Sequence, residues 1–186
     1  MRAWIVVVLA LAGWSSGCNA SAEAGTTSRS RTKRPAPPAE RGQGDLPRDQ
    51  VVINEIVARP AEGPDWIELY NRGAAEVDLS GAYLTDDPDQ LGHYYQFPAG
   101  TRLAPGARLV VLADDGKGAG EGHHARFKLA ANEGVFLLRH DGVALDAVPY
   151  ITREKGGGLA RLPDGEGRLY QVSEPTPGAA NQGARR

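Results

Sequence analysis

Two apolar runs separated by a turn constrain this chain more than any other feature. The first run is Val51–Val57 and the second is Asp65–Asn71, and both are rich in β-branched and aromatic residues. Between them lie Pro60, Gly63 and Pro64, residue types that favour turns over regular structure. The pattern predicts two β-strands joined by a short loop.

Both runs hold polar residues at positions that a strand would bury. In the second run, Trp66 and its apolar neighbours leave Glu68 as the polar residue of the interior, which predicts a strand covered on most of both faces. In the first run, Asn54 and Glu55 form a polar pair inside apolar sequence. A buried pair needs partners, because an unpaired buried polar group costs about 1–3 kcal/mol. We therefore predict that the Asn54 side chain satisfies a backbone group at a strand end.

The rest of the chain after Val51 alternates short apolar runs with turns, about every eight to fifteen residues. This spacing is typical of an all-β sandwich or barrel. Asp141-Gly142 is a strong hairpin signal, since both residues tolerate the positive φ of a tight turn. No window sustains apolar residues at helical period. The further strands that we expect lie within 77–84, 93–97, 109–112, 135–139, 143–148, 159–162 and 169–170.

Several short motifs follow one another in a fixed order along this part of the chain. They are INEI at 53–56, DWIELYN at 65–71, an LSG step at 79–81, F-P-x-G at 97–100, L-x-P-G at 103–106 and PTPG-x-x-N at 175–181. Together they resemble the lamin tail domain family, over about 130 residues from Val51 to Asn181. The resemblance implies an immunoglobulin-like β-sandwich of a kind found in many secreted bacterial proteins. The signature positions, to which we assign structural roles, are Asn54, Glu55, Trp66, Glu68, Asn71, Leu79, Gly81, Pro98, Gly100, Pro177 and Gly178.

The N-terminus has the three parts of a signal peptide, which we assign to residues 1–17. Arg2 supplies a positive charge, Ala3–Leu11 is apolar, and mostly small residues follow. The apolar part is too short to span a bilayer stably. Cys18, the only cysteine of the sequence, follows Ser-Ser-Gly, which resembles a bacterial lipobox and predicts lipid attachment. Cleavage after Ala20-Ser21-Ala22 is the alternative, and it would release the chain.

Composition divides the remainder into a tether, a domain and a short tail. Residues 18–50 are small, polar or charged, a composition that does not offset the entropy of ordering, so we predict a disordered tether. The predicted domain is 51–182 and the tail is 183–186. Residues 1–50 hold seven Lys or Arg and four Asp or Glu, so residues 51–186 hold 14 and 19 and carry a net charge of −5. An acidic domain lacks the basic footprint of a duplex-binding surface, so no nucleic acid is expected as a partner.

No recognisable catalytic constellation accompanies these signals. Beyond Val51 the sequence has no G-x-S-x-G elbow and no histidine in a triad context. His123 and His124 lie at the end of a Gly-rich stretch, where we predict solvent-exposed side chains that point in opposite directions. We interpret Glu55 and Glu68 as hydrogen-bond acceptors within the fold rather than as an acid–base pair.

Two acidic loop pairs are the weak candidates for a metal site. They are Asp86 with Asp87 and Asp114 with Asp115, which would hold calcium if their loops met at one end of the sandwich. Neither pair has the spacing of an EF-hand or a nonapeptide repeat. Aspartates in such loops commonly cap their own turns, so we expect no cofactor and no metal.

These signals together favour a non-catalytic module at the cell envelope. Lipid on Cys18 would anchor the exported chain to the membrane, and the β-sandwich would bind an envelope protein or glycan. Secretion without an anchor is the alternative location. A metal-dependent secreted enzyme and a self-assembling structural envelope protein are the alternative functions.

Overall fold

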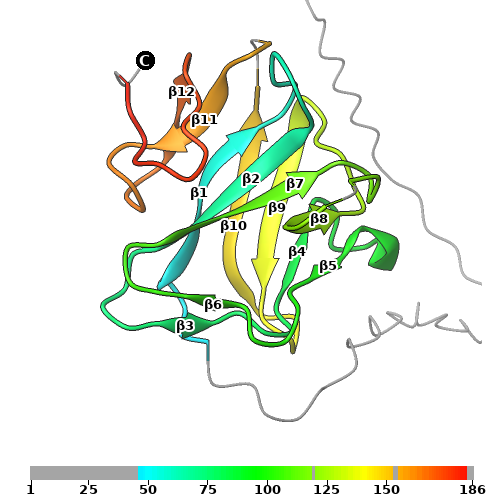
Figure 1. Cartoon of the computed structure of the whole chain (residues 1–186), viewed down its shortest axis with the longest axis vertical. Helices are drawn as coiled ribbons and strands as arrows, with labels where there is room; N and C mark the ends of the chain where they lie inside the picture. The colour runs from blue at the N-terminus through cyan, green and yellow to red at the C-terminus, as the bar shows by residue number, and fades with distance from the viewer. Residues whose placement is uncertain (1–45, 119, 153–154, 184–186) are drawn as a thin grey trace, which may run out of the picture. The chain divides into compact units, whose positions relative to one another are not determined.

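Strands supply nearly all of the regular structure in the described part of this protein (Figure 1). The computed structural model describes residues 46–118, 120–152 and 155–183, and across them no helix has the length and apolarity needed to cross a membrane. One 3₁₀ turn, η1, spans Leu91–His93. The strands are β1 (Val51–Val57), β2 (Asp65–Asn71), β3 (Val77–Asp78), β4 (Tyr83–Thr85), β5 (Tyr95–Gln96), β6 (Arg102–Leu103), β7 (Arg108–Ala113), β8 (His123–Ala125), β9 (Asn132–Leu138), β10 (Ala144–Ile151), β11 (Gly158–Arg161) and β12 (Leu169–Val172).

Two sheets pack against each other, and a small third sheet lies beside them (Figure 1). The first sheet has the strand order β12-β11-β1-β2-β7-β8, the second has the order β10-β9-β4-β5, and β3 pairs with β6. All of these pairings are antiparallel except that of β7 with β8, which is parallel. The predicted all-β sandwich is confirmed.

The core lies between the inner faces of the two large sheets. Its residues of 1% exposure or less in strands β1, β2, β4 and β9 are Ile53, Ile56, Ile67, Leu69, Leu84, Val135 and Leu137. Burial of each such side chain contributes about 1.5–3 kcal/mol. On the outer face of β2, Trp66 is 8% exposed and Glu68 is 0% exposed. The prediction that β2 is covered on both faces is therefore confirmed.

The hairpin of β9 and β10 forms at the predicted Asp-Gly turn. The Gly142 N–H donates to the Arg139 carbonyl at 2.8 Å, and the Arg139 N–H donates to the Val143 carbonyl at 2.8 Å. Gly142 has a φ of 83°, whereas Asp141 is not among the residues with positive φ. The turn thus takes the three-residue form that needs a left-handed residue only at its last position. The predicted hairpin is confirmed, and of the two turn residues only Gly142 uses positive φ.

The folded domain includes residues before Val51. Leu46 is 4% exposed and belongs to the core, and the carbonyl of Gln50 accepts a hydrogen bond from the Arg72 N–H at 2.8 Å. The predicted tether at 18–50 therefore extends too far, because Leu46 and Gln50 belong to the domain. A single leucine among polar residues gives no periodic pattern in the sequence. Its burial therefore becomes visible only in the folded structure, where it packs into the core. The predicted signal peptide at 1–17, Cys18 and the tether up to residue 45 lie outside the described residues.

The aromatic run at 93–97 is mostly not a strand. His93 closes the 3₁₀ turn η1, and only Tyr95–Gln96 pairs, with β4. Ring contacts hold the other aromatic residues, since Tyr94 lies edge-on to Tyr83 at 5.5 Å between centroids. The Phe97 N–H donates to the Ala82 carbonyl at 3.0 Å and the Phe97 carbonyl accepts the Gly81 N–H at 2.9 Å, so ring contacts and these two backbone bonds hold the run where a longer strand was expected.

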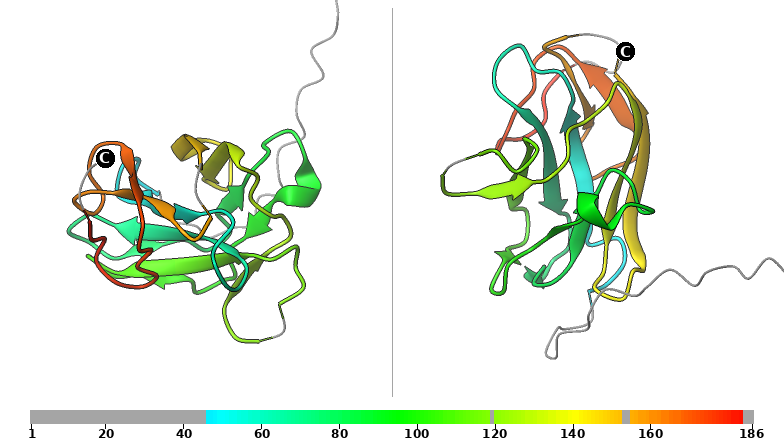
Figure 2. Two further views of the ribbon diagram at one scale, coloured as in Figure 1. Left: turned by 90° about the horizontal axis from the view of Figure 1, so that it is seen from above. Right: turned by 90° about the vertical axis from the view of Figure 1, so that its right-hand side faces the viewer.

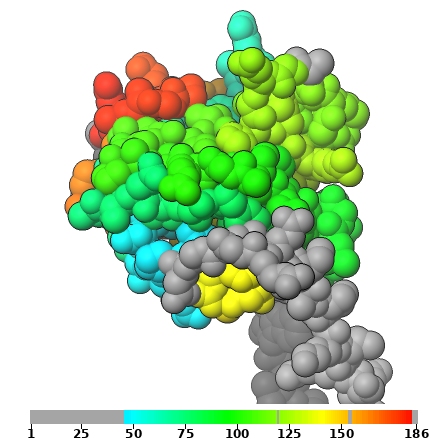
Figure 3. All heavy atoms as spheres, turned by 60° about the horizontal axis from the view of Figure 1, so that its bottom comes forward, coloured from blue at the N-terminus to red at the C-terminus, as the bar shows by residue number. Residues whose placement is uncertain are grey.

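One side of the sandwich has sheets of unequal width. β10 is an edge strand of the second sheet and contacts β1, whereas the first sheet continues past β1 through β11 and β12. The Ile53 N–H donates to the Asp146 carboxylate at 2.8 Å, and Figure 3 shows the yellow end of the β9–β10 hairpin near the cyan start of β1. In Figures 1 and 2 the β11–β12 hairpin lies on the opposite side of the domain from η1. The inner face of β11 and β12 thus extends beyond the last strand of the second sheet.

Candidate functional site

A β-bulge in β1 brings the polar residues of the signature together. The pairing of β1 with β2 matches Ile53 with Leu69 and then Glu55 with Glu68, so the register shifts by one residue at Asn54. Because successive strand residues alternate between faces, a regular strand would send Asn54 and Glu55 to opposite sides. The bulge lets both side chains lie on the outer face opposite Glu68, while the flanking isoleucines stay in the core.

Asn54 is fully buried and uses both ends of its amide. Its Oδ1 accepts the Gly165 N–H at 2.9 Å, and its Nδ2 donates to Glu68 Oε1 at 3.0 Å and to Asp164 Oδ1 at 2.8 Å. The predicted contact with a backbone group is present. That group lies in the turn between β11 and β12, 111 residues away in sequence, rather than in the strand of Asn54 itself.

Glu55 and Glu68 are both 0% exposed, and the C-terminal segment 175–181 supplies their donors. Glu55 accepts the N–H and the hydroxyl of Thr176 at 3.2 Å, and Glu68 accepts the Gly178 N–H at 2.7 Å. Burial is the largest effect on both carboxyls: it raises the pKa of Glu55 to about 7 and also raises the pKa of Glu68. The hydrogen bonds from the C-terminal segment act in the opposite direction on both.

An ion pair and a last asparagine complete this polar network. Arg108 donates to Asp164 and lies 3.6 Å from Glu68 Oε1, and its guanidinium stacks 4.8 Å from the centre of the Tyr70 ring. Asn181 donates to the backbone carbonyls of Asn54 and Arg161 at 3.2 and 2.9 Å. The network therefore fastens residues 175–181 over the outer face of the first sheet.

The contacts of Glu55 and Glu68 are all made within the fold. Both carboxylates are closed off from solvent and each already accepts hydrogen bonds from the C-terminal segment. A general acid or base must reach the proton that it transfers, and these two groups face no open space. The interpretation of Glu55 and Glu68 as acceptors within the fold agrees with this geometry.

The other signature positions lie at turns and strand ends. Asn71 is fully buried, donates to the carbonyls of Ala75 and Leu103 at 2.8 Å, and accepts the Gly73 N–H at 2.9 Å. Leu79 is a core residue, and Pro98 and Pro177 are exposed. The signature glycines all have positive φ, a conformation that few other residues adopt without strain: they are Gly81, Gly100 and Gly178.

The four aspartates proposed for calcium each have another partner. Asp86 contacts His93 Nδ1 at 2.8 Å, and Asp114 contacts His124 Nδ1 at 2.6 Å. Asp87 accepts N–H groups within its own turn, and Asp115 pairs with Lys117. Across residues 46–118, 120–152 and 155–183 there is no group of three or more His, Cys, Asp or Glu suited to holding a metal ion.

His123 and His124 are strand residues, and the prediction of solvent-exposed loop side chains was wrong. Both are half-buried in β8, which pairs in parallel with β7. His123 Nδ1 contacts the Tyr95 hydroxyl at 2.6 Å, while His124 contacts Asp114. The Gly-rich stretch lets the chain turn back onto the sheet, and the two rings lie on opposite faces as predicted.

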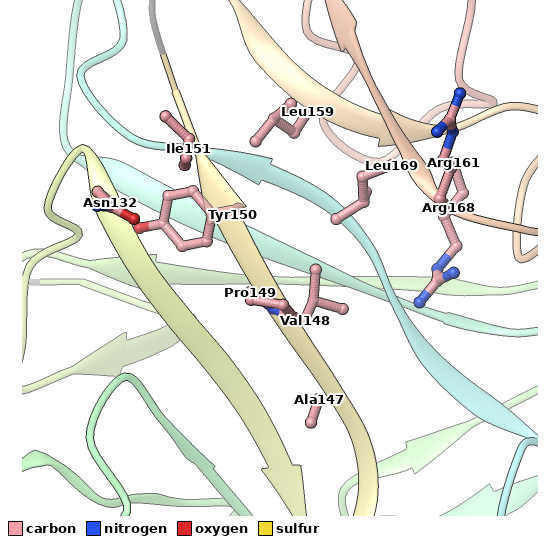
Figure 4. A pocket seen from close by; sticks show the side chains of 10 residues that line it. All are labelled: Asn132, Ala147, Val148, Pro149, Tyr150, Ile151, Leu159, Arg161, Arg168 and Leu169. Atoms are coloured by element: carbon pink, nitrogen blue, oxygen red, sulfur yellow. The ribbon is translucent and has the colours of Figure 1, made fainter. Parts of the chain in front are cut away.

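A groove of about 870 Å³ lies where the first sheet extends past the second. Figure 4 shows its side chains around an open space between β10 and the β11–β12 hairpin. Ile151, at 56% exposure, is one of two large hydrophobic side chains that the described part of the chain leaves exposed. The lining residues are Asn132, Ala147, Val148, Pro149, Tyr150, Ile151, Leu159, Arg161, Arg168 and Leu169.

The sequence did not reveal the partners that the polar network around Asn54 draws from distant segments, and it did not reveal the groove. Asp164, Thr176 and Asn181 lie more than 100 residues after Asn54, and only the PTPG-x-x-N motif hinted that the C-terminal segment belongs to the same unit. The groove had no local signal, because it arises from the unequal widths of two sheets.

Comparison with known proteins assigns the family. The model of the Lamin Tail Domain family matches residues 46–152, which is more than half of the chain, and β11, β12 and the C-terminal segment lie beyond the match. No curated protein matches the sequence. Lamin tail domains are immunoglobulin-like sandwiches with interaction or structural roles that are not typically catalytic. The chain therefore belongs to the lamin tail domain family.

Proposed function

We propose that this protein is a binding module of the cell envelope, anchored by lipid on Cys18, whose groove binds a protein partner. The observation that carries the proposal is the groove itself, which combines an exposed edge strand, apolar walls and an accessible arginine. Apolar concave surfaces with a few polar groups are the usual form of a binding site. Aliphatic walls without an exposed aromatic platform favour a polypeptide over a glycan.

Anchoring would act through effective concentration. Residues 19–45 would tether the domain near the membrane, which raises the local concentration of the module around envelope partners. Several acyl chains on one residue hold a protein at a membrane durably, because each buried CH₂ contributes about 0.8 kcal/mol. The test is metabolic labelling with a fatty acid: we expect label on the wild type, and loss of label with release from membranes for Cys18→Ser. Unlabelled wild-type protein in the medium would favour plain secretion.

The binding proposal is tested by photo-crosslinking in cells that produce the protein naturally. One variant carries a photoreactive residue at Ile151 in the groove, and the control carries it at Leu91 on η1. The two side chains are matched, with 56% and 57% exposure. We expect Ile151 to form an adduct with a specific envelope protein that Leu91 does not form.

Other outcomes separate the competing functions. Equal adducts at both positions would refute a groove-specific partner. Adducts of the protein with itself alone would favour a self-assembling structural protein, and adducts with envelope polysaccharide would favour a glycan ligand. Activity that depends on Asp86, Asp87, Asp114 and Asp115 together with bound metal would favour the enzyme alternative.

A further inference from the structure

We propose that the groove binds an extended peptide as an added strand beside β10, and that the peptide carries an acidic side chain that pairs with Arg168. This inference rests on the proposed function for the location of the site. It adds the conformation and the charge of the partner, which no feature of the family match specifies.

The backbone of β10 is open on the groove side. The Thr152 N–H donates to the Ala131 carbonyl at 2.9 Å, so alternate residues Tyr150 and Val148 also direct their backbone groups toward β9. The residues between them direct theirs toward the groove. The position of Pro149 is consistent with this alternation, because proline in a strand is tolerated where its nitrogen faces away from the neighbouring strand.

Specific backbone groups are therefore available to a ligand. The carbonyls of Ala147, Pro149 and Ile151 and the N–H of Ile151 face the groove, while the Ala147 N–H already donates to the Asp146 carboxylate at 2.9 Å. These groups span five residues, which suits a short extended peptide. Addition of a strand to a sheet edge uses such groups for affinity and side-chain pockets for selectivity.

The part of the first sheet that extends past β1, made of β11 and β12, forms the second wall of the groove. Leu159 of β11 and Leu169 of β12 line the groove opposite Ile151. A strand placed beside β10 would fill the position that the second sheet leaves vacant opposite β11 and β12. Because strand side chains alternate between faces, every second residue of the peptide would cover these leucines. Aliphatic residues at alternate positions are thus expected in the ligand.

Charge selects an acidic peptide. Arg161 is already engaged, since its Nη2 lies 3.1 Å from Asp146 Oδ2 and its Nε donates to the Ile53 carbonyl at 2.9 Å. Arg168 is exposed and stacks 5.1 Å from the centre of the Tyr170 ring, and within the described residues no carboxylate pairs with it. A carboxylate on the peptide would form a charge-assisted hydrogen bond with the Arg168 guanidinium.

The charges on this chain argue against its own segments as the occupant. Residues 1–50 carry seven Lys or Arg against four Asp or Glu, a net charge of +3, and residues 184–186 are Ala-Arg-Arg, so both segments are basic on balance and match Arg168 poorly. A second copy is also disfavoured, because Pro149 on each of two paired β10 edges would remove a donor from the shared ladder.

The test measures binding of defined peptides to the purified full chain. The probes are fluorescein-labelled heptapeptides of alternating valine and threonine with aspartate near one end or the other, and matched peptides with lysine in its place. Affinities are measured by fluorescence anisotropy. The aspartate peptide that binds the wild type more tightly of the two should have an affinity about fivefold or more higher than that of its lysine match. Arg168→Glu should reverse that preference, and Arg126→Glu, an exposed arginine after β8, should leave it unchanged.

Amide hydrogen exchange gives an independent readout. On peptide binding, the Ile151 N–H should become protected, while the Tyr150 N–H, which already faces β9, should change little. Equal affinity for aspartate and lysine peptides, or an unprotected Ile151 N–H in the saturated complex, would overturn the inference. If no peptide binds but Ile151 still crosslinks a specific protein in cells, the inference fails while the proposed function stands.

Discussion

Replacement of Glu55 by glutamine tests whether burial governs the polar network. Glu55 is 0% exposed and its pKa is raised to about 7 from an ordinary value of 4.5, mainly by burial. The folded protein thus holds this proton more tightly than the unfolded chain does. The free energy of unfolding should therefore fall as pH rises from about 4.5 to about 7, and this contribution should be constant above that range.

The pKa values set the expected magnitude. A pKa of about 7 instead of 4.5 corresponds to roughly 3 kcal/mol, of which roughly 2 kcal/mol is lost between pH 5 and pH 8. Glutamine keeps the shape and the acceptor oxygen for the Thr176 N–H but cannot ionise. Relative to the wild type, Glu55→Gln should therefore gain roughly 2 kcal/mol of stability between pH 5 and pH 8.

Guanidinium unfolding of both proteins at the two pH values measures this difference directly. Glu174→Gln is the control, because Glu174 is an exposed glutamate near the same C-terminal segment, and its effect should be the same at both pH values. A relative stability of Glu55→Gln that is flat with pH, or that falls toward pH 8, would refute the reasoning. It would mean that hydrogen bonds from Thr176 outweigh burial and keep the carboxylate ionised.

Three further changes test the same architecture by thermal and denaturant unfolding. Asn54→Ala removes the acceptor of the Gly165 N–H and should cost about 2–4 kcal/mol, so an unchanged melting temperature would show that this contact is dispensable. Truncation after Glu174 removes the donors that cover Glu55, so it should destabilise the domain and also abolish the pH-dependent difference described above. Gly118→Ala would place a Cβ 1.9 Å from His124 Nδ1 and should cost about 1–3 kcal/mol, and the loss should shrink when the alanine is combined with His124→Ala.

The sequence by itself determined most of the strands and turns and the need for partners. The β-branched runs, the Asp141-Gly142 turn and the alternating apolar spacing are local signals, and each produces a local structure that the fold retains. The polar pair Asn54-Glu55 inside an apolar run indicated that buried polar groups would have to be satisfied.

The identity of those partners came only from the tertiary structure. A one-residue bulge turned Asn54 and Glu55 to the same face, and the fold brought Gly165 to Asn54 and Thr176 to Glu55 from more than 100 residues away. The groove has the same origin, since it exists because one sheet has two more strands than the other. Pairing and register depend on contacts between distant segments, so no window of sequence contains them.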